Sequence, residues 1–206
     1  MRAATEDEVW LAVAAPSTWP VALTVDERYV PFDRLQGVAE RISARLGGAH
    51  LRVGQSTYVL GLAARLWAAT LGCVVRDGVL PDPAAFVARD EDGAVQLGIS
   101  RYDGWRDVTP YDLLDRVVAV LAPVVESLPL SPRLLWGNVA SALHAAPRVL
   151  ELPAARGWAD EMLALPPLAG EMVAGRRTTC CLYYEVPGGG LCGDCVLSRV
   201  PERSPG

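Results

Sequence analysis

Four cysteines lie close together near the C-terminus of this 206-residue chain and could bind a metal. They are Cys180, Cys181, Cys192 and Cys195, and their spacing is C-C-x10-C-x2-C. Four thiolates in one short segment form a soft sulfur site, which selects zinc or an iron–sulfur cluster. A redox-active dithiol is the third use of such a pattern. The segment is therefore predicted to bind a metal or to carry out thiol redox chemistry.

The arrangement of the cysteines favours an iron–sulfur cluster over zinc. Zinc sites more often have two C-x2–4-C pairs, and here only Cys192 and Cys195 have that form. Adjacent side chains such as those of Cys180 and Cys181 diverge in an extended chain, so both can bind one centre only if the backbone turns there. A two-iron core leaves more room for this turn than a single zinc ion does.

Residues around the cysteines could stabilise an anionic cluster. Burying such a charge requires compensation, and arginines flank the motif on both sides. Glycines would let backbone N–H groups approach the sulfurs, and hydrogen bonds of that kind raise a reduction potential. Aromatic and apolar side chains could exclude water. The arginines are Arg176, Arg177, Arg199 and Arg203, the glycines are Gly188, Gly189, Gly190 and Gly193, and the shielding residues are Tyr183, Tyr184 and Leu191.

Three other motifs do not predict a site. Residues 188–193 fit G-x-G-x-x-G, but only 13 residues follow them, too few for a dinucleotide-binding βαβ unit. Cys192 and Cys195 form a C-x-x-C, but the helix and sheet of a thioredoxin are missing after it. No G-x-S-x-G is present, so a hydrolase nucleophile is not indicated.

The elements that must position the cysteines are mainly helical. Apolar residues recur at helical spacing in five segments. These begin near Asp33, Ser56, Thr109, Ser131 and Trp158, and end near Gly47, Gly72, Pro123, Pro147 and Leu165. Residues 85–89 and 94–99 flank a glycine-ended turn and predict a β-hairpin, and residues 21–30 could add a strand. We expect a mainly α-helical α+β fold: a body over residues 1–165 with a hairpin near 85–99, then a connector and cysteine segment over 166–206.

Composition limits the partners and the cellular location that we expect for the protein. The net charge is −5 and there is no basic block, so a nucleic-acid partner is not expected. No run reaches 18 apolar residues, so no membrane span is expected, although peripheral membrane association stays open. Glu6, Asp7 and Glu8 precede the first apolar run and have the wrong charge for a signal peptide. We therefore expect a cytoplasmic location, where clustered thiols stay reduced and bind metals.

Several other residues have ordinary interpretations. Cys73 has apolar neighbours and is expected to be a small buried hydrophobe. His144 and His50 lack a partner at ligand spacing. Asn138 and Ser141 share a helix face and could either hydrogen-bond the cysteine segment or simply pack. Trp105 could line a pocket, although ordinary packing accounts for it better.

The cysteine motif, together with Trp136-Gly137-Asn138 within residues 135–143, resembles the FhuF-type siderophore-iron reductases. The resemblance implies that Cys180, Cys181, Cys192 and Cys195 ligate a [2Fe–2S] cluster. It also implies one-electron reduction of a cytoplasmic ferric siderophore, chiefly a hydroxamate, with electrons from an external donor and docking on the helical body. Two alternatives stay open: a zinc-stapled siderophore-binding protein without redox activity, and a [2Fe–2S] ferredoxin that serves another oxidoreductase.

Overall fold

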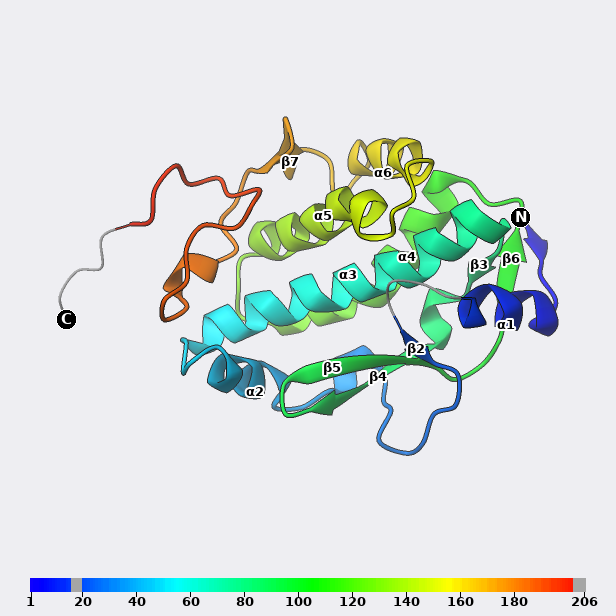
Figure 1. The fold of residues 1–206 in the computed structure, drawn as a ribbon, viewed down its shortest axis with the longest axis horizontal. Helices are drawn as coiled ribbons and strands as arrows, with labels where there is room; N and C mark the ends of the chain where they lie inside the picture. The colour runs from blue at the N-terminus through cyan, green and yellow to red at the C-terminus, as the bar shows by residue number, and fades with distance from the viewer. Residues whose placement is uncertain (16–19, 202–206) are drawn as a thin grey trace.

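One long helix runs through the middle of the protein. The computed structural model describes residues 1–15 and 20–201. In it α3 (Leu51–Asp77) follows the long axis of the molecule, with α5 (Pro132–Val149) and α4 (Pro110–Ser127) beside it (Figure 1). The shorter helices are α1 (Glu6–Ala14), α2 (Val38–Arg45) and α6 (Ala155–Leu163). The N-terminus lies at one end of the molecule and the cysteine segment at the other.

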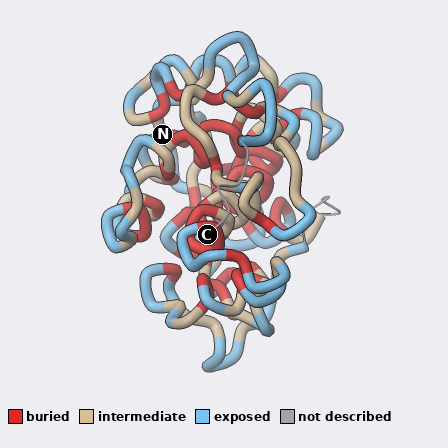
Figure 2. Tube along the Cα trace, turned by 90° about the vertical axis from the view of Figure 1, so that its left-hand side faces the viewer, coloured by how far each residue is buried: buried red, intermediate tan, exposed pale blue. Residues whose placement is uncertain are grey.

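Burial explains the position of α3. Leu62, Leu66 and Trp67 on this helix have no exposed surface, and buried segments gather in the middle of the molecule (Figure 2). By length and composition alone α3 could span a bilayer. However, 72% of its most apolar stretch is buried inside the protein, so α3 is the central core helix of this fold.

The predicted ends of α3 were wrong. The helix begins at Leu51, and Ser56 is a buried residue inside it. It passes Gly72 and ends at Asp77, and the C-cap residue Gly78 has a φ of 67°, which suits a glycine. Helix packing overrides the local stop signal, because the space beside Gly72 is filled by the Leu150 side chain.

The first predicted helix also starts later than expected. Asp33 belongs to the short 3-10 helix η1 (Phe32–Arg34), and α2 begins only after Gly37, whose φ is 67°. A glycine in the left-handed region therefore precedes α2, and a side-chain cap at Asp33 does not start it. The predicted end near Gly47 is confirmed.

The start of α4 is as predicted. Thr109 and Asp112 form a capping box, in which the Asp112 N–H donates to the Thr109 hydroxyl and the Thr109 N–H donates to the Asp112 carboxylate. Pro123 does not end this helix, because its ring lies on the exposed side while Val124 and Val125 stay buried.

The last two helices differ from the prediction at their ends. α5 continues past Pro147, which is buried in its last turn, and ends at Val149. A proline in the last turn interrupts few hydrogen bonds, so tertiary packing can retain it. α6 begins at Ala155, before the predicted start at Trp158, and ends at Leu163.

Three small sheets complete the fold. The predicted hairpin is confirmed as β4 (Phe86–Glu91) and β5 (Ala94–Ile99), joined by a two-residue turn with positive φ angles. β2 (Val21–Ala22) adds to β5 in parallel, so this sheet is not purely antiparallel. The second sheet has the order β1 (Arg2–Ala3), β6 (Gly104–Arg106), β3 (Leu80–Pro81), and the third pairs β7 (Met172–Val173) with β8 (Arg176–Arg177). The fold is mainly α-helical α+β, as predicted.

The β1–β6–β3 sheet lies at the end of the molecule opposite the cysteine segment (Figure 1). Trp105 on β6 is partly buried, and the Arg116 guanidinium stacks on its ring at 3.4 Å. Trp105 therefore packs as a structural residue, far from the cysteines. The neighbouring arginines are also paired, Arg101 with Asp82 and Arg106 with Glu8.

Candidate metal centre

A tight hairpin brings the cysteine segment back to the helical body. β7 and β8 are joined by Ala174 and Gly175, with φ angles of 49° and 74°. After the turn, the Arg177 N–H donates to the Asp194 carbonyl at 2.9 Å, which pairs β8 with the loop that carries Cys192 and Cys195. The first part of the predicted connector and cysteine segment over residues 166–206 thus contains a β-hairpin, which sets the position of Arg177.

A small apolar cluster and an ion pair dock the segment on the start of α3. Val186 is buried against Ala49 and Val53. Beside this cluster, the Arg52 Nε donates to a carboxylate oxygen of Glu185 at 2.9 Å. These contacts hold the stretch between the two cysteine pairs at one end of the central helix.

The backbone turns directly after the adjacent cysteines. Leu182 has a φ of 67°, and the short 3-10 helix η3 (Tyr183–Glu185) follows it. Because of this turn, the Leu182 N–H lies 3.3 Å from the Cys180 sulfur. The backbone therefore turns next to the adjacent cysteines, at the residue that follows them, while convergence of Cys180 and Cys181 on one centre stays a prediction.

The N–H donors to sulfur are not the glycines that the sequence suggested. Among the described residues, the N–H groups that contact cysteine sulfurs belong to residues two positions after a cysteine: Leu182 contacts Cys180, and Leu197 contacts Cys195 at 3.4 Å. Gly189 serves close packing instead, since a Cβ there would lie 2.8 Å from the Tyr183 carbonyl oxygen. The prediction of amide donors to sulfur is confirmed, and the residues assigned to it were wrong.

The four cysteine side chains gather at this end of the molecule, in two degrees of exposure. Cys181 and Cys195 are each 6% exposed, while Cys180 and Cys192 are half-buried. The sulfurs of Cys181 and Cys192 lie 3.5 Å apart. Two thiolates on one tetrahedral metal, with metal–sulfur bonds of about 2.3 Å, lie about 3.8 Å apart. This pair therefore fits two ligands of one metal.

Within the described residues, no three His, Cys, Asp or Glu side chains converge on a single ion position. Burial raises the pKa of the Cys180 thiol. It also raises the pKa of Cys192, where the nearby Cys181 adds to the effect. Both shifts favour the protonated thiol, so binding of a metal by these thiolates has to release protons.

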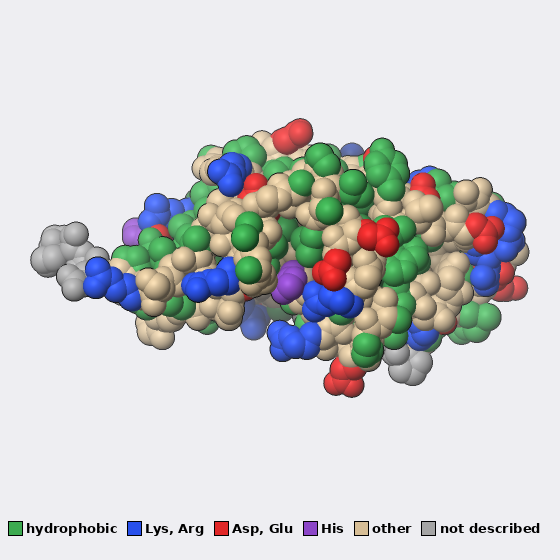
Figure 3. All heavy atoms as spheres, turned by 90° about the horizontal axis from the view of Figure 1, so that it is seen from above, with side chains coloured by type: hydrophobic (Ala, Val, Ile, Leu, Met, Phe, Trp, Pro, Cys, Tyr) green, Lys and Arg blue, Asp and Glu red, His purple; other side chains and the backbone are tan. Residues whose placement is uncertain are grey.

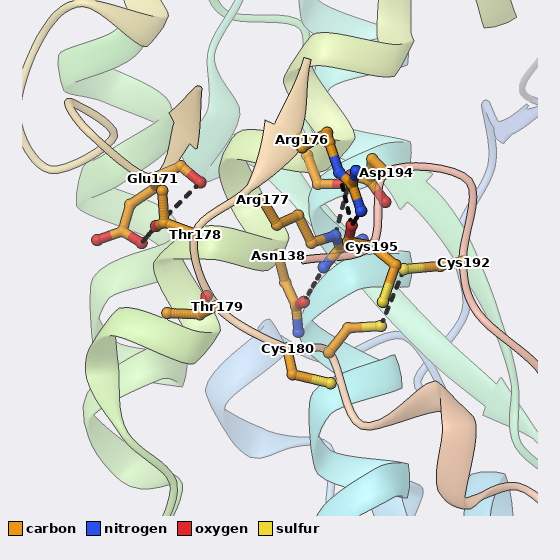
Figure 4. A network of polar contacts seen from close by, with 12 residues as sticks. Asn138, Glu171, Arg176, Arg177, Thr178, Thr179, Cys180, Cys192, Asp194 and Cys195 are labelled. Atoms are coloured by element: carbon orange, nitrogen blue, oxygen red, sulfur yellow. Dashed lines mark hydrogen bonds and ion pairs between the residues drawn. The ribbon is translucent and has the colours of Figure 1, made fainter. Parts of the chain in front are cut away.

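A buried arginine joins the cysteine segment to the body. Arg177 is 4% exposed, and its guanidinium donates to the Asp194 carboxylate at 2.9 Å and to the Asn138 side-chain oxygen (Figure 4). The Asn138 amide then donates to the carbonyl and hydroxyl oxygens of Ser56, both at 2.9 Å. The Ser56 hydroxyl donates to the Cys181 carbonyl at 2.7 Å. This chain of contacts connects both cysteine pairs to α3 and α5.

Ser141 completes the network from the same face of α5. Its hydroxyl donates to the Asp194 carboxylate at 2.5 Å. Burial alone would raise the pKa of Asp194, but the bond from Ser141 and the charge of Arg177 outweigh burial and hold this pKa below the usual range of a carboxyl. Of the two interpretations of Asn138 and Ser141, hydrogen bonding to the cysteine segment is confirmed. Sequence reasoning missed Asp194 and Ser56, although Asp194 stands between two cysteines.

The other residues considered from the sequence have separate places. Arg176 is exposed and donates to the Cys195 carbonyl at 2.6 Å; Arg199 is exposed, and Arg203 lies outside the described residues. Cys73 is 5% exposed, as predicted, and burial raises its pKa to about 12. His50 is the exposed N-cap residue of α3.

Gly137 lets the segment approach α5. A Cβ at this position would lie 2.4 Å from the Thr179 hydroxyl oxygen, next to Cys180. We expect Gly137→Ala to displace residues 178–180, to lower the iron content per chain and to destabilise the protein by about 1–3 kcal/mol, as overpacking does. Metal analysis and thermal unfolding measure both effects.

The matched control is Gly157→Ala in α6, where nothing lies within 4 Å of the added Cβ. It should leave the iron content unchanged and should not destabilise the helix, because alanine is the better helix former. Equal effects of the two substitutions would show that close approach at Gly137 is not needed.

Comparison with known proteins agrees with the cysteine motif. Residues 177–197 match the family model described as FhuF 2Fe-2S C-terminal domain, and this range contains all four cysteines together with Arg177 and Asp194. No curated protein matches the chain. The match confirms the resemblance that the cysteine spacing predicts and supports an iron–sulfur cluster. The C-terminal segment of this chain is thus similar to the FhuF 2Fe-2S C-terminal domain over residues 177–197.

Proposed function

We propose that this protein is a cytoplasmic ferric-siderophore reductase whose four C-terminal cysteines ligate a [2Fe–2S] cluster. In this proposal residues 166–206 hold the cluster and residues 1–165 form the docking body. The family match of residues 177–197 supports the iron–sulfur assignment. The Cys181–Cys192 separation of 3.5 Å supports two thiolates on one iron.

The observation that most supports the proposal is the difference in exposure among the four cysteines. Cys181 and Cys195 are buried against the body, while Cys180 and Cys192 reach the surface. A group held by these residues has one side in protein and one side near solvent, where an external molecule can approach it. The buried guanidinium of Arg177 lies beside the site and is paired with the Asp194 carboxylate, so it anchors the ligand loop without adding a negative charge to that of the thiolates.

A cluster bound there would supply one electron to the ferric ion of a docked siderophore, with a hydroxamate as the proposed chelating group. Hydroxamate oxygens are hard ligands that hold Fe(III) far better than Fe(II), so a single electron releases the iron. The chain holds the site near its surface and excludes water from its inner side. A separate protein has to return the electron, because the sequence shows no nicotinamide or flavin motif.

The test is reoxidation of the reduced protein by substrate. Anaerobic protein is reduced with dithionite, freed of excess reductant and mixed with ferric hydroxamates. We expect the visible spectrum of the oxidised cluster to return and one Fe(II) per electron to be trapped by a ferrous chelator. A coloured protein that no ferric chelate reoxidises would be a ferredoxin for another partner. A colourless protein with stoichiometric zinc would be the zinc-stapled binding protein.

A further inference from the structure

A cleft of about 460 Å³ opens beside the cysteine segment, between α5 and α6. This volume lies within the usual range of small-molecule sites. One wall is the α5 face that carries Ser141, His144 and Arg148, and Arg156 of α6 forms another. Gly175 of the β7–β8 turn and the pair Gly193-Asp194 close the side toward the cysteines.

The cleft adjoins the metal centre directly. Gly193 and Asp194 are the two residues between Cys192 and Cys195, so the cleft wall and the ligand loop are the same stretch of chain. Asp194 is held to α5 by the Ser141 hydroxyl. A molecule in the cleft therefore sits against the loop that carries the half-buried Cys192.

The charges that face the cleft are predominantly positive. The carboxylate of Asp194 is already paired with Arg177, and Arg156 has a distant contact with the exposed Asp160 at 3.7 Å. Arg156 also donates to the His144 carbonyl at 3.3 Å, which fixes its position. Arg148 is exposed and, in the part of the chain that the structure describes, makes no ion pair. On the face of the molecule that carries α6, basic side chains and a histidine surround a hollow (Figure 3).

We propose that this cleft binds the carboxylate-bearing part of an anionic ferric siderophore. The inference rests on the proposed function and narrows its substrate to chelates with free or bridging carboxylates, such as citrate-based hydroxamates. Two guanidinium groups match carboxylates in geometry and charge. They would also offset the repulsion between an anionic chelate and an anionic cluster. A cationic hydroxamate chelate would gain nothing from these arginines.

Gallium(III) chelates test the cleft without any electron transfer, because Ga(III) has the charge and nearly the size of Fe(III) but is not reduced. Isothermal titration calorimetry of the oxidised protein would compare the gallium complex of a citrate-based dihydroxamate with cationic gallium–desferrioxamine B. We expect the anionic complex to bind at least about tenfold more tightly. The double substitution Arg148→Gln with Arg156→Gln should weaken its binding by at least about tenfold and leave the cationic complex unaffected.

Arg34→Gln is the matched control, since Arg34 is exposed on η1 and lies outside the cleft. This substitution removes one exposed positive charge and should change the affinity for the anionic gallium complex by no more than about twofold. Iron content and circular dichroism of all variants should equal those of the parent protein. Equal binding of the two gallium complexes, unchanged binding in the double variant, or equally tight binding of metal-free citrate would each overturn the proposal.

The outcomes separate the cleft from the reductase. Binding of the anionic gallium chelate that depends on Arg148 and Arg156, without reoxidation by the ferric form, would support the cleft and refute the reductase. Ferric chelates could also reoxidise the double variant at the same rate as the parent protein, with the same dependence on chelate concentration. That result would support the proposed reductase function and refute the proposed binding in the cleft.

Discussion

Cys192→Ser should abolish the red-brown colour of the protein, together with nearly all of its iron and acid-labile sulfide. Cys192 is half-buried and its sulfur lies 3.5 Å from that of Cys181, so the two are placed as ligands of one metal. A serine hydroxyl is a harder and far less acidic ligand than a thiol, and iron–sulfur clusters are held by thiolates. Visible absorbance with iron and sulfide analysis of anaerobically purified protein measures the result.

The matched control for this prediction is Cys73→Ser. Cys73 is buried in α3 and its thiol contacts the Ala12 carbonyl at 3.4 Å, a contact that a hydroxyl can also make. This variant should retain full colour and lose only about 1–2 kcal/mol of stability. An unchanged spectrum in Cys192→Ser, or loss of colour in Cys73→Ser, would show that the ligand set is wrong.

Local signals in the sequence predict some elements of this fold and miss others, such as α1. The β4–β5 hairpin and the Thr109 capping box follow from residues within a few positions of one another. The start of α3 did not follow, because a serine before an apolar run resembles an N-cap. Ser56 is instead a buried side chain that bonds the Cys181 carbonyl. A local pattern cannot distinguish a cap from a tertiary hydrogen bond, since both use the same hydroxyl.

The same limit applies to the site. The cysteine spacing alone predicts the metal segment, because four thiolates in one short stretch have few other uses. The contacts that hold the segment in place join residues far apart in the sequence. Asn138 hydrogen-bonds Ser56, 82 positions away, and Arg177 hydrogen-bonds Asn138, 39 positions away. Arg177 was identified only as a flanking charge. Its burial and its two partners depend on how β8 packs on α5, which no local pattern contains.

Arg177→Met should strongly destabilise the protein and weaken its metal binding. It leaves the Asp194 carboxylate and the Asn138 side-chain oxygen without their shared donor in a mostly buried position. Breaking a buried ion pair by removing one partner costs about 3–5 kcal/mol. Urea unfolding of the purified protein should show a loss of this size, with reduced iron content because the loop between Cys192 and Cys195 loses its anchor.

Two further variants distinguish the effect of breaking the buried Arg177–Asp194 ion pair from the effect of losing any one positive charge. Arg176→Met removes the neighbouring but exposed arginine together with its hydrogen bond to the Cys195 carbonyl, and it should cost clearly less than Arg177→Met because no buried charge loses its partner. Combining Arg177→Met with Asp194→Asn removes the unpaired charge, so the double variant should be more stable than Arg177→Met alone. Equal losses of stability in Arg176→Met and Arg177→Met would contradict the anchoring role.

In material that retains the cluster, Arg177→Met should also lower the reduction potential of the cluster. A nearby positive charge favours the reduced state, which is the more negative one. A purely structural role of Arg177 would leave that potential unchanged.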